Sequence, residues 1–296
     1  MRVITLLPAA TEIVAALGGA GSLVGISHEC DYPASVQGLP RVTATPVNIA
    51  AAGAAIDAEV RRLRDAGQAV IGIAADLLRR LAPDLVITQD LCEVCAVADG
   101  EVHRLTTALH PAPAILSLEA RDLHGIWSDI RRVGQALDLK DEAEELVLGL
   151  RSRLKRLLPS PRAKTPRVLC IEWLDPLYLA GHWVPELVAA AGGQDVGASP
   201  GSHSARRQWG ELRGLKPDHV IVMLCGFGVE RARAELRALQ EPEGLGLLRT
   251  VPVSIIDGNA YTSRPGPRVV DGAQRIQWAL TGQSSTGVQR WQPQPA

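Results

Sequence analysis

The sequence predicts an α/β fold with two small parallel-sheet lobes joined by a long helix. Short apolar, β-branched segments alternate with helical patterns over the 296 residues, which is typical of parallel sheets covered by helices. A long amphipathic stretch then separates an earlier set of strand-like segments from a later set. The expected strands are Val3–Leu6, Leu23–Ile26, Leu85–Thr88, Ala114–Leu118, Arg167–Ile171, Val220–Leu224 and Val253–Ile256.

The amphipathic stretch predicts the connecting helix. Leu123, Ile126, Trp127 and Ile130 follow helical spacing. The pattern continues to Leu157 after a polar break at Lys140–Asp141, and a Pro-rich segment ends it. The polar, Gln- and Pro-rich end of the chain is expected to be disordered. The predicted organisation is an amino-terminal lobe at 1–120, a connecting helix at 121–160, a carboxyl-terminal lobe at 161–282 and a disordered tail at 283–296.

Composition excludes several classes of partner. A formal net charge of −1 gives no electrostatic case for binding nucleic acid. No apolar stretch is long enough to insert into a membrane. The first segment contains Pro8 and Glu12 and lacks the pattern of a secretory signal, so we expect a cytoplasmic protein. Five cysteines in that compartment favour metal binding, redox chemistry or free thiols over a disulfide framework.

Four cysteines follow predicted strands, namely Cys30, Cys92, Cys95 and Cys225. Because the carboxyl ends of parallel strands face the ligand crevice, these thiols are expected to approach one cleft. Such soft ligands suit zinc or an iron–sulfur cluster. The alternative is that they only pack as small residues at turns. The fifth, Cys170, lies within a strand-like segment and is predicted to belong to the core.

Two further segments carry binding chemistry. The loop Ser27–Pro33 contains His28, which offers a metal ligand, although a capped turn explains the same residues. The segment Glu172–Leu187 is interpreted as a loop-rich stretch with an aromatic face for a flat ligand and an imidazole for a metal. Burial of its two tryptophans is the alternative. Its candidates are Trp173, Tyr178, His182 and Trp183.

The turn Asp257–Arg268 is a third candidate, in which Tyr261 and Arg264 are placed to contact a ligand. Proline and glycine explain this turn equally well without any ligand. No catalytic motif of a hydrolase, metalloprotease, nucleotide-binding loop or dinucleotide fold is present. The sequence therefore favours a binding protein over an enzyme.

Taken in order, several motifs resemble the helical-backbone substrate-binding proteins of metal-chelate transport, which have the class III periplasmic-binding-protein fold. The resemblance extends from about Arg2 to Leu280. Its motifs are LLPAATEIVAALG, LVGISHECDYP, LAPDLVIT, DPLYLAGHWVPELVAAAGG, LKPDHVIV and RPGPR. The resemblance implies two α/β lobes with a ligand cleft between them, and aromatic residues that hold the corrin ring in cobalamin-binding members. The positions that match those aromatics are Tyr32, Tyr178 and Tyr261.

The leading interpretation is a non-enzymatic binding protein for a corrinoid or another metal chelate. Its apolar walls are predicted at Tyr32, Trp173, Tyr178, Trp183 and Tyr261, and its metal ligand at His28, Cys30 or His182. The expected partners are the chelate itself and an ABC transporter or a corrinoid-using enzyme. One alternative is a zinc or iron–sulfur centre held by the four thiols. Another is an enzyme that uses Cys92 and Cys95, or a metal in the cleft, for redox or catalytic chemistry.

Overall fold

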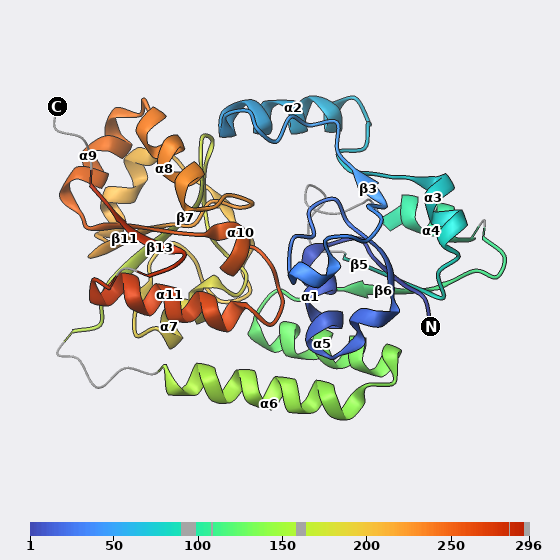
Figure 1. Ribbon diagram of the computed structural model, residues 1–296. Coiled ribbons are helices and arrows are strands. Elements are labelled where there is room, and N and C mark those ends of the chain that lie inside the picture. The colour runs from blue at the N-terminus through green and yellow to red at the C-terminus, as the bar shows by residue number, and fades with distance from the viewer. Residues whose placement is uncertain (90–98, 108, 158–163, 284, 293–296) are drawn as a thin grey trace. The chain divides into compact units, whose positions relative to one another are not determined.

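The computed structural model describes residues 1–89, 99–107, 109–157, 164–283 and 285–292 (Figure 1). Contacts within the chain divide it into two compact units. The first lobe comprises residues 1–51, 55–120 and 124–149. The second lobe comprises residues 52–54, 121–123 and 150–296. Each lobe is built on its own sheet with helices packed against it, which confirms the predicted α/β fold class.

The sheet of the first lobe has four parallel strands in the order β2-β1-β5-β6. All five residues of the central strand β5 are buried. Helices cover such a sheet on both faces, so its strands are apolar along their length rather than alternating. The strands are β1 (Val3–Thr5), β2 (Leu23–Ile26), β5 (Leu85–Gln89) and β6 (Ala114–Leu118). Each agrees with the sequence prediction to within one residue.

Helices and short elements complete the first lobe. Pro8 opens the first helix, where a missing backbone N–H costs nothing. Side chains from several helices join Ile4 and Val86 in one core cluster. The helices are α1 (Pro8–Ala16), α3 (Ala75–Leu81), α4 (Asp99–Thr107) and α2 (Gly53–Asp65), of which the first two residues belong to the second lobe. The short elements are the 3₁₀ turns Gly19–Ser22 and Ala34–Val36 and the two-stranded ribbon of β3 (Thr43–Ala44) and β4 (Gly72–Ile73).

The sheet of the second lobe has the order β10-β8-β7-β11-β12-β13, with β9 paired to β7. Strands β7, β9, β11 and β12 are parallel, whereas β8, β10 and β13 are antiparallel to their neighbours. Ile171, Ile221 and Ile255 are fully buried at its centre. The strands are β7 (Arg167–Leu174), β8 (Leu177–Leu179), β9 (Gln194–Asp195), β10 (Ala205–Arg206), β11 (His219–Val222), β12 (Val253–Ile256) and β13 (Val288–Trp291).

In the part of the second lobe that the structure describes, helices and one 3₁₀ turn pack beside the sheet. Pro185 lies in the first turn of α7, where proline's missing N–H costs no hydrogen bond, and α7 packs against α11. The elements are α7 (Val184–Ala190), the 3₁₀ turn Trp209–Leu215, α8 (Val229–Ala238), α9 (Pro242–Thr250), α10 (Gly258–Tyr261) and α11 (Val269–Thr281).

The prediction of one long connecting helix is wrong. The stretch forms two helices, α5 (Leu123–Leu137) and α6 (Lys140–Arg156), separated by Asp138 in a left-handed conformation with φ of 59° (Figure 1). The turn closes tightly, since the Leu139 N–H donates to the Gly134 carbonyl at 2.7 Å. A side chain at Gly134 would place its Cβ 2.8 Å from the Leu139 oxygen, so this turn requires glycine. Helical periodicity persists through the break, which is why the sequence pattern concealed it.

The prediction of a disordered tail is also wrong for its described part. Residues Val288–Trp291 form β13, which pairs antiparallel with β12, and Trp291 is buried. The polar composition of the segment concealed its two buried apolar residues, Val288 and Trp291, which lie at the two ends of the strand. Among the residues described, no helix has the length and apolar character needed to cross a membrane.

Candidate functional site

In the first lobe, the loop after β2 lies at the carboxyl edge of the sheet and carries His28. The Thr43 hydroxyl accepts the backbone N–H of His28 at 2.9 Å and donates to Ser27 Oγ at 3.2 Å. His28 Nδ1 lies 2.7 Å from the same hydroxyl. Because the hydroxyl proton is used on Ser27, Nδ1 must be the donor in this bond. The neutral tautomer therefore leaves the lone pair of His28 on Nε2, which has no hydrogen-bond partner among the described residues.

The charge state of His28 also suits a ligand. Partial burial lowers the pKa of this imidazole, the Glu29 carboxylate raises it, and the Arg41 guanidinium lowers it again. The net direction is downward, so the ring stays neutral to a lower pH than an exposed histidine. A neutral imidazole with a fixed tautomer is a competent metal ligand.

The structure places the Cys30 thiol inside the first lobe. Cys30 is 1% exposed, and its Sγ lies 3.0 Å from Thr11 Oγ1. The Arg41 guanidinium holds this loop by donating to the carbonyls of Ser27 and Cys30. This packing agrees with the alternative interpretation, in which the Cys30 thiol only packs as a small residue. In contrast, Tyr32 is 48% exposed, as an aromatic contact for a ligand requires.

Cys92 and Cys95 lie outside the described residues, so their role as metal ligands stays a prediction. Cys225 follows β11 and is partly exposed. Its backbone N–H donates to the Glu172 carbonyl at 3.0 Å. Over the described ranges, no group of three or more histidine, cysteine, aspartate or glutamate side chains is arranged to hold a metal ion. Cys170 is core, as predicted, and burial raises the pKa of its thiol well above the usual range.

In the second lobe, two predicted wall residues face each other across neighbouring strands. Trp173 of β7 and Tyr178 of β8 are direct cross-strand partners, so their side chains share one face of the sheet. Both are partly exposed. The sequence interpretation of this stretch as loop-rich is wrong, because β7 extends to Leu174 and β8 begins at Leu177. The strand pairing explains how these aromatics come together.

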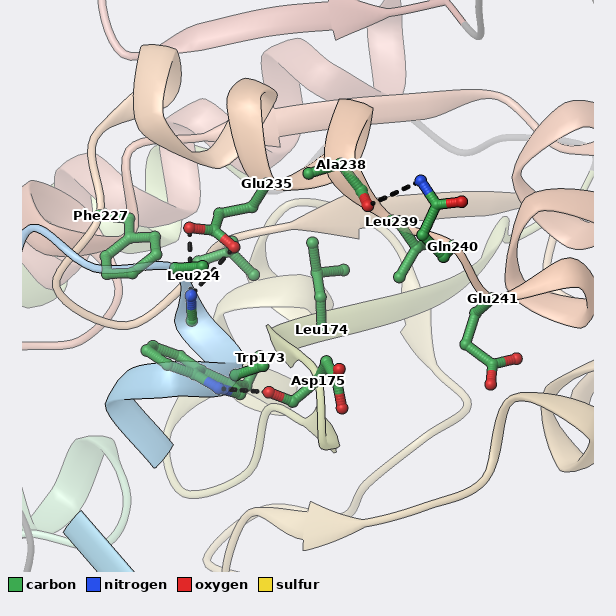
Figure 2. Close-up of a pocket in the computed structure, with 13 residues that line it drawn as sticks. Trp173, Leu174, Asp175, Leu224, Phe227, Glu235, Ala238, Leu239, Gln240 and Glu241 are labelled. Carbon is green, nitrogen blue, oxygen red and sulfur yellow. Dashed lines mark hydrogen bonds between the residues drawn. The ribbon is translucent and has the colours of Figure 1, made fainter. Parts of the chain in front are cut away.

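A pocket of about 300 Å³ lies at the carboxyl ends of β7 and β11 (Figure 2). Trp173 and Phe227 lie toward one side of the view, with ring centres 5.1 Å apart, and Gln240 and Glu241 lie toward the other. Asp175, Glu235 and Glu241 bring carboxylates to its lining, and no lysine or arginine lines it among the described residues. The pocket is therefore an apolar, aromatic hollow with an acidic rim.

The first turn of α2 forms part of this pocket. The Gly53 backbone N–H donates to both carboxylate oxygens of Glu235, at 3.2 and 3.1 Å. A Cβ on Gly53 would lie 3.4 Å from Trp173 Cζ2, so the glycine packs closely on the indole. Residues 52–54 belong to the second lobe. The Glu235 carboxylate also lies at the amino-terminal end of α2, where the helix dipole favours a negative charge.

Trp183 is placed differently from the prediction. It is 5% exposed, and its indole N–H donates to the Thr262 carbonyl at 2.9 Å. A tryptophan buried with its only donor satisfied is a packing residue. Burial, the alternative given in the sequence analysis, therefore applies to Trp183. The prediction that Trp183 forms a ligand wall is corrected, because this residue belongs to the core of the second lobe.

Tyr261 and Arg264 lie in the predicted turn after β12. The Tyr261 ring packs against Gly287, and the guanidinium of Arg275 lies 4.0 Å from its centre. Arg264 is buried and donates to the Asn259 side-chain oxygen at 2.8 Å. Tyr261 is partly exposed, so a ligand contact stays a prediction for it. Arg264 supports the turn from within.

His182 lies in the connection between β8 and α7. Its backbone is left-handed, with φ of 54°, and burial lowers the pKa of its imidazole, as do His203 and Arg121. The buried Nε2 has no hydrogen-bond partner among the described residues. The ring of His203 lies 5.4 Å away, centre to centre.

Three residues of these sites were not predicted from the sequence. Phe227 is the only phenylalanine of the chain and follows β11 closely, so its position after a strand was a usable signal. Glu235 on α8 and His203 before β10 gave no such signal, because only the fold brings them to Gly53 and His182.

Comparison with known proteins gives a consistent result. The sequence profile of the periplasmic binding protein family matches residues 3–245. No curated protein matches the chain. A periplasmic heme binding protein from Pseudomonas aeruginosa is 20% identical, with a TM-score of 0.73, over 100% of this chain and 99% of that one.

Two other solved structures have the same fold. The periplasmic vitamin B12 binding protein of Vibrio cholerae is 20% identical, with a TM-score of 0.64, over 95% of this chain and 96% of that one. An ABC transporter substrate-binding protein from Listeria monocytogenes is 16% identical, with a TM-score of 0.66, over 94% of this chain and 97% of that one. At these identities the likeness establishes the two-lobed fold.

Proposed function

Because the chain belongs to the periplasmic binding protein family, whose members are non-enzymatic solute-binding proteins, we propose that it binds a metal chelate, and specifically a corrinoid. Relatives of the same fold are described as binding heme or vitamin B12. Both ligands are flat macrocycles around a metal. Partly exposed aromatic side chains, such as Trp173 and Tyr178, suit such a ring face.

The acidic rim of the pocket is the observation that favours a corrinoid over heme. Asp175, Glu235 and Glu241 present carboxylates and no cation lines the described pocket. A corrinoid carries primary amides around its ring, which donate hydrogen bonds to carboxylates. Heme instead carries propionates, which the same carboxylates repel. A pocket of about 300 Å³ fits a peripheral side chain and an edge of the ring, not the whole macrocycle.

This proposal predicts a preference that titration measures. Purified protein is titrated with cyanocobalamin and with hemin, and binding is followed by calorimetry and by absorbance. We expect the corrinoid to bind at least tenfold more tightly, a difference of about 1.4 kcal/mol. Equal or tighter binding of hemin contradicts the corrinoid assignment while leaving chelate binding intact. Failure to bind either ligand contradicts the proposed function.

A paired variant tests whether the rim causes the preference. Glu241→Gln removes one carboxylate from the pocket lining. It is expected to bind hemin several-fold more tightly and to leave corrinoid affinity nearly unchanged, since an exposed charge contributes about 1 kcal/mol. Glu243→Gln, two residues further along in the first turn of α9 and outside the pocket lining, is the matched control and should change neither affinity.

We further propose that His28 is the metal ligand among the predicted candidates. Its Nε2 lone pair is available, whereas the Cys30 thiol is buried against Thr11. Bound aquacobalamin should show the visible absorption shift of a nitrogen ligand replacing water, and His28→Ala should abolish that shift. Because the pKa of His28 is lowered, the shift should persist at pH 6. Cys30→Ser, as the control, should keep it. A spectrum unchanged in His28→Ala rules out this role.

The protein that receives the chelate and the cellular location of this chain are also proposals. An ABC transporter fits the description of the Listeria relative, and a corrinoid-using enzyme is the other candidate acceptor. A cytoplasmic location is still predicted, although relatives are described as periplasmic. Cell fractionation tests it, and recovery of the protein outside the cytoplasm contradicts it.

A further inference from the structure

The loop that contains His203 is tied directly to His182. The His182 backbone N–H donates to the Ser202 carbonyl at 2.6 Å, and the Gly201 N–H donates to the His182 carbonyl at 2.9 Å. These bonds hold His182 in its left-handed conformation, with φ of 54°. A non-glycine residue in that conformation costs of order 1 kcal/mol and persists only where its surroundings enforce it. The two histidines are therefore brought together by fixed backbone, not by chance rotamers.

The imidazole of His182 has unused binding capacity. Its Nε2 is buried and has no hydrogen-bond partner in the part of the chain that the structure describes. Leaving such a nitrogen unpaired costs about 1–3 kcal/mol. Burial, His203 and Arg121 all lower the pKa of this ring, so protonation does not relieve the cost. A neutral, unpaired nitrogen of this kind is available to bind a metal ion.

His203 supplies a second nitrogen at a suitable distance. The two ring centres are 5.4 Å apart, with the ring planes at 85°. Two imidazoles bound to one ion through bonds of about 2.0–2.1 Å have ring centres about 5 Å apart. His203 is exposed, so its ring is free to turn a nitrogen toward His182. From this geometry we infer that His182 and His203 together bind one divalent transition-metal ion, with Zn²⁺ as the representative ion.

The chemistry of the pair defines the class of ion. Neutral imidazoles suit Zn²⁺, Ni²⁺ and Cu²⁺ and are poor ligands for Mg²⁺ or Ca²⁺. Two ligands leave the remaining positions to water, and the nearby Arg121 charge moderates the affinity. The two rings meet edge to face with centres 5.4 Å apart, so they offer neighbouring positions of one ion rather than the opposite axial positions of a macrocycle. This ion is therefore distinct from the metal of a bound chelate.

The test is a titration of chelate-free protein with Zn²⁺ by calorimetry. The starting chain carries Cys92→Ser, Cys95→Ser and Cys225→Ser, so that thiolates do not compete for zinc. We expect one Zn²⁺ per chain and no heat of binding with Mg²⁺. His203→Ala is expected to weaken the affinity for Zn²⁺ at least tenfold. His182→Asn should do the same while tolerating the left-handed backbone, which asparagine adopts more readily than alanine.

The controls separate this site from other histidines. His124→Ala removes an exposed histidine of α5 in the first lobe and should leave the affinity unchanged. His28→Ala should also leave it unchanged, which separates this ion from the proposed chelate ligand. Unaltered Zn²⁺ affinity in both His182→Asn and His203→Ala overturns the inference. Because no chelate is present, the result does not depend on whether the protein binds a corrinoid.

Discussion

Replacing Trp183 by alanine is expected to lower the free energy of unfolding by about 3–5 kcal/mol, the usual cost of removing a large buried aromatic side chain. The indole is 5% exposed and donates to the Thr262 carbonyl at 2.9 Å. Removing it leaves a cavity in the second lobe and also leaves that carbonyl without its donor. Urea unfolding followed by far-ultraviolet circular dichroism measures the change.

Trp183→Phe separates the two contributions. Phenylalanine retains most of the packing but cannot donate to Thr262, so it should cost about 1–3 kcal/mol, the penalty for a buried acceptor without a partner. If Trp183→Ala keeps nearly full stability but loses corrinoid affinity, the original prediction of a ligand wall is restored and the core assignment is wrong.

Trp173→Ala is the functional counterpart of that substitution. Trp173 is partly exposed beside the pocket, pairs with Tyr178, and lies against Phe227. Its truncation is therefore expected to cost less stability than Trp183→Ala and, under the proposed function, to weaken chelate binding, which titration with cyanocobalamin measures. Two tryptophans ten residues apart in the segment Glu172–Leu187 thus have different roles. Trp173 lies near the carboxyl end of β7 at the pocket, whereas Trp183 is buried and donates to Thr262 in the turn after β12.

Most of the parallel strands were predictable because their signal is local. They carry apolar, often β-branched residues, as in Leu85–Ile87 of β5, and burial on both faces favours that composition. The parallel strand β9 has the sequence Gln194–Asp195, lacks this signal and was not predicted. The placement of Cys30 and Cys225 after strands was predictable for the same reason. Whether a side chain after a strand points inward or outward depends on neighbours distant in sequence. Thr11 buries the Cys30 thiol, and no local pattern near Cys30 indicates it.

The break between α5 and α6 shows a second limit of the sequence. Apolar periodicity reports which face of a helix is buried, and both helices bury a face, so the pattern continued across Asp138. The stronger signal was Gly134, whose small size allows the turn to close. The His182–His203 pair was beyond sequence analysis altogether, since the two residues are 21 positions apart and meet through backbone bonds to Ser202 and Gly201.

Asp195 should make the stability of the second lobe depend on pH. Burial raises the pKa of this carboxyl to about 6, and hydrogen bonds from the Gly197 and Ala198 N–H groups offset only part of that shift. The folded state therefore binds a proton more tightly than the unfolded chain. The contribution of protonated Asp195 to the free energy of unfolding is fully present below about pH 4 and is lost as the pH rises through 6. A shift of about two units corresponds to about 3 kcal/mol.

Asp195→Asn is expected to remove this dependence. Asparagine keeps a side-chain oxygen that accepts from Gly197 and Ala198 but never ionises beside the buried Cys170 thiol. The free energy of unfolding of the variant minus that of the natural chain should therefore rise by about 3 kcal/mol between pH 4 and pH 8. Urea titrations at both pH values measure it. Asp76→Asn, at an exposed position of α3, is the control and should show no such rise. A constant difference for Asp195→Asn means that folding does not raise the pKa of this carboxyl, with water reaching the side of the lobe where β9 pairs with β7.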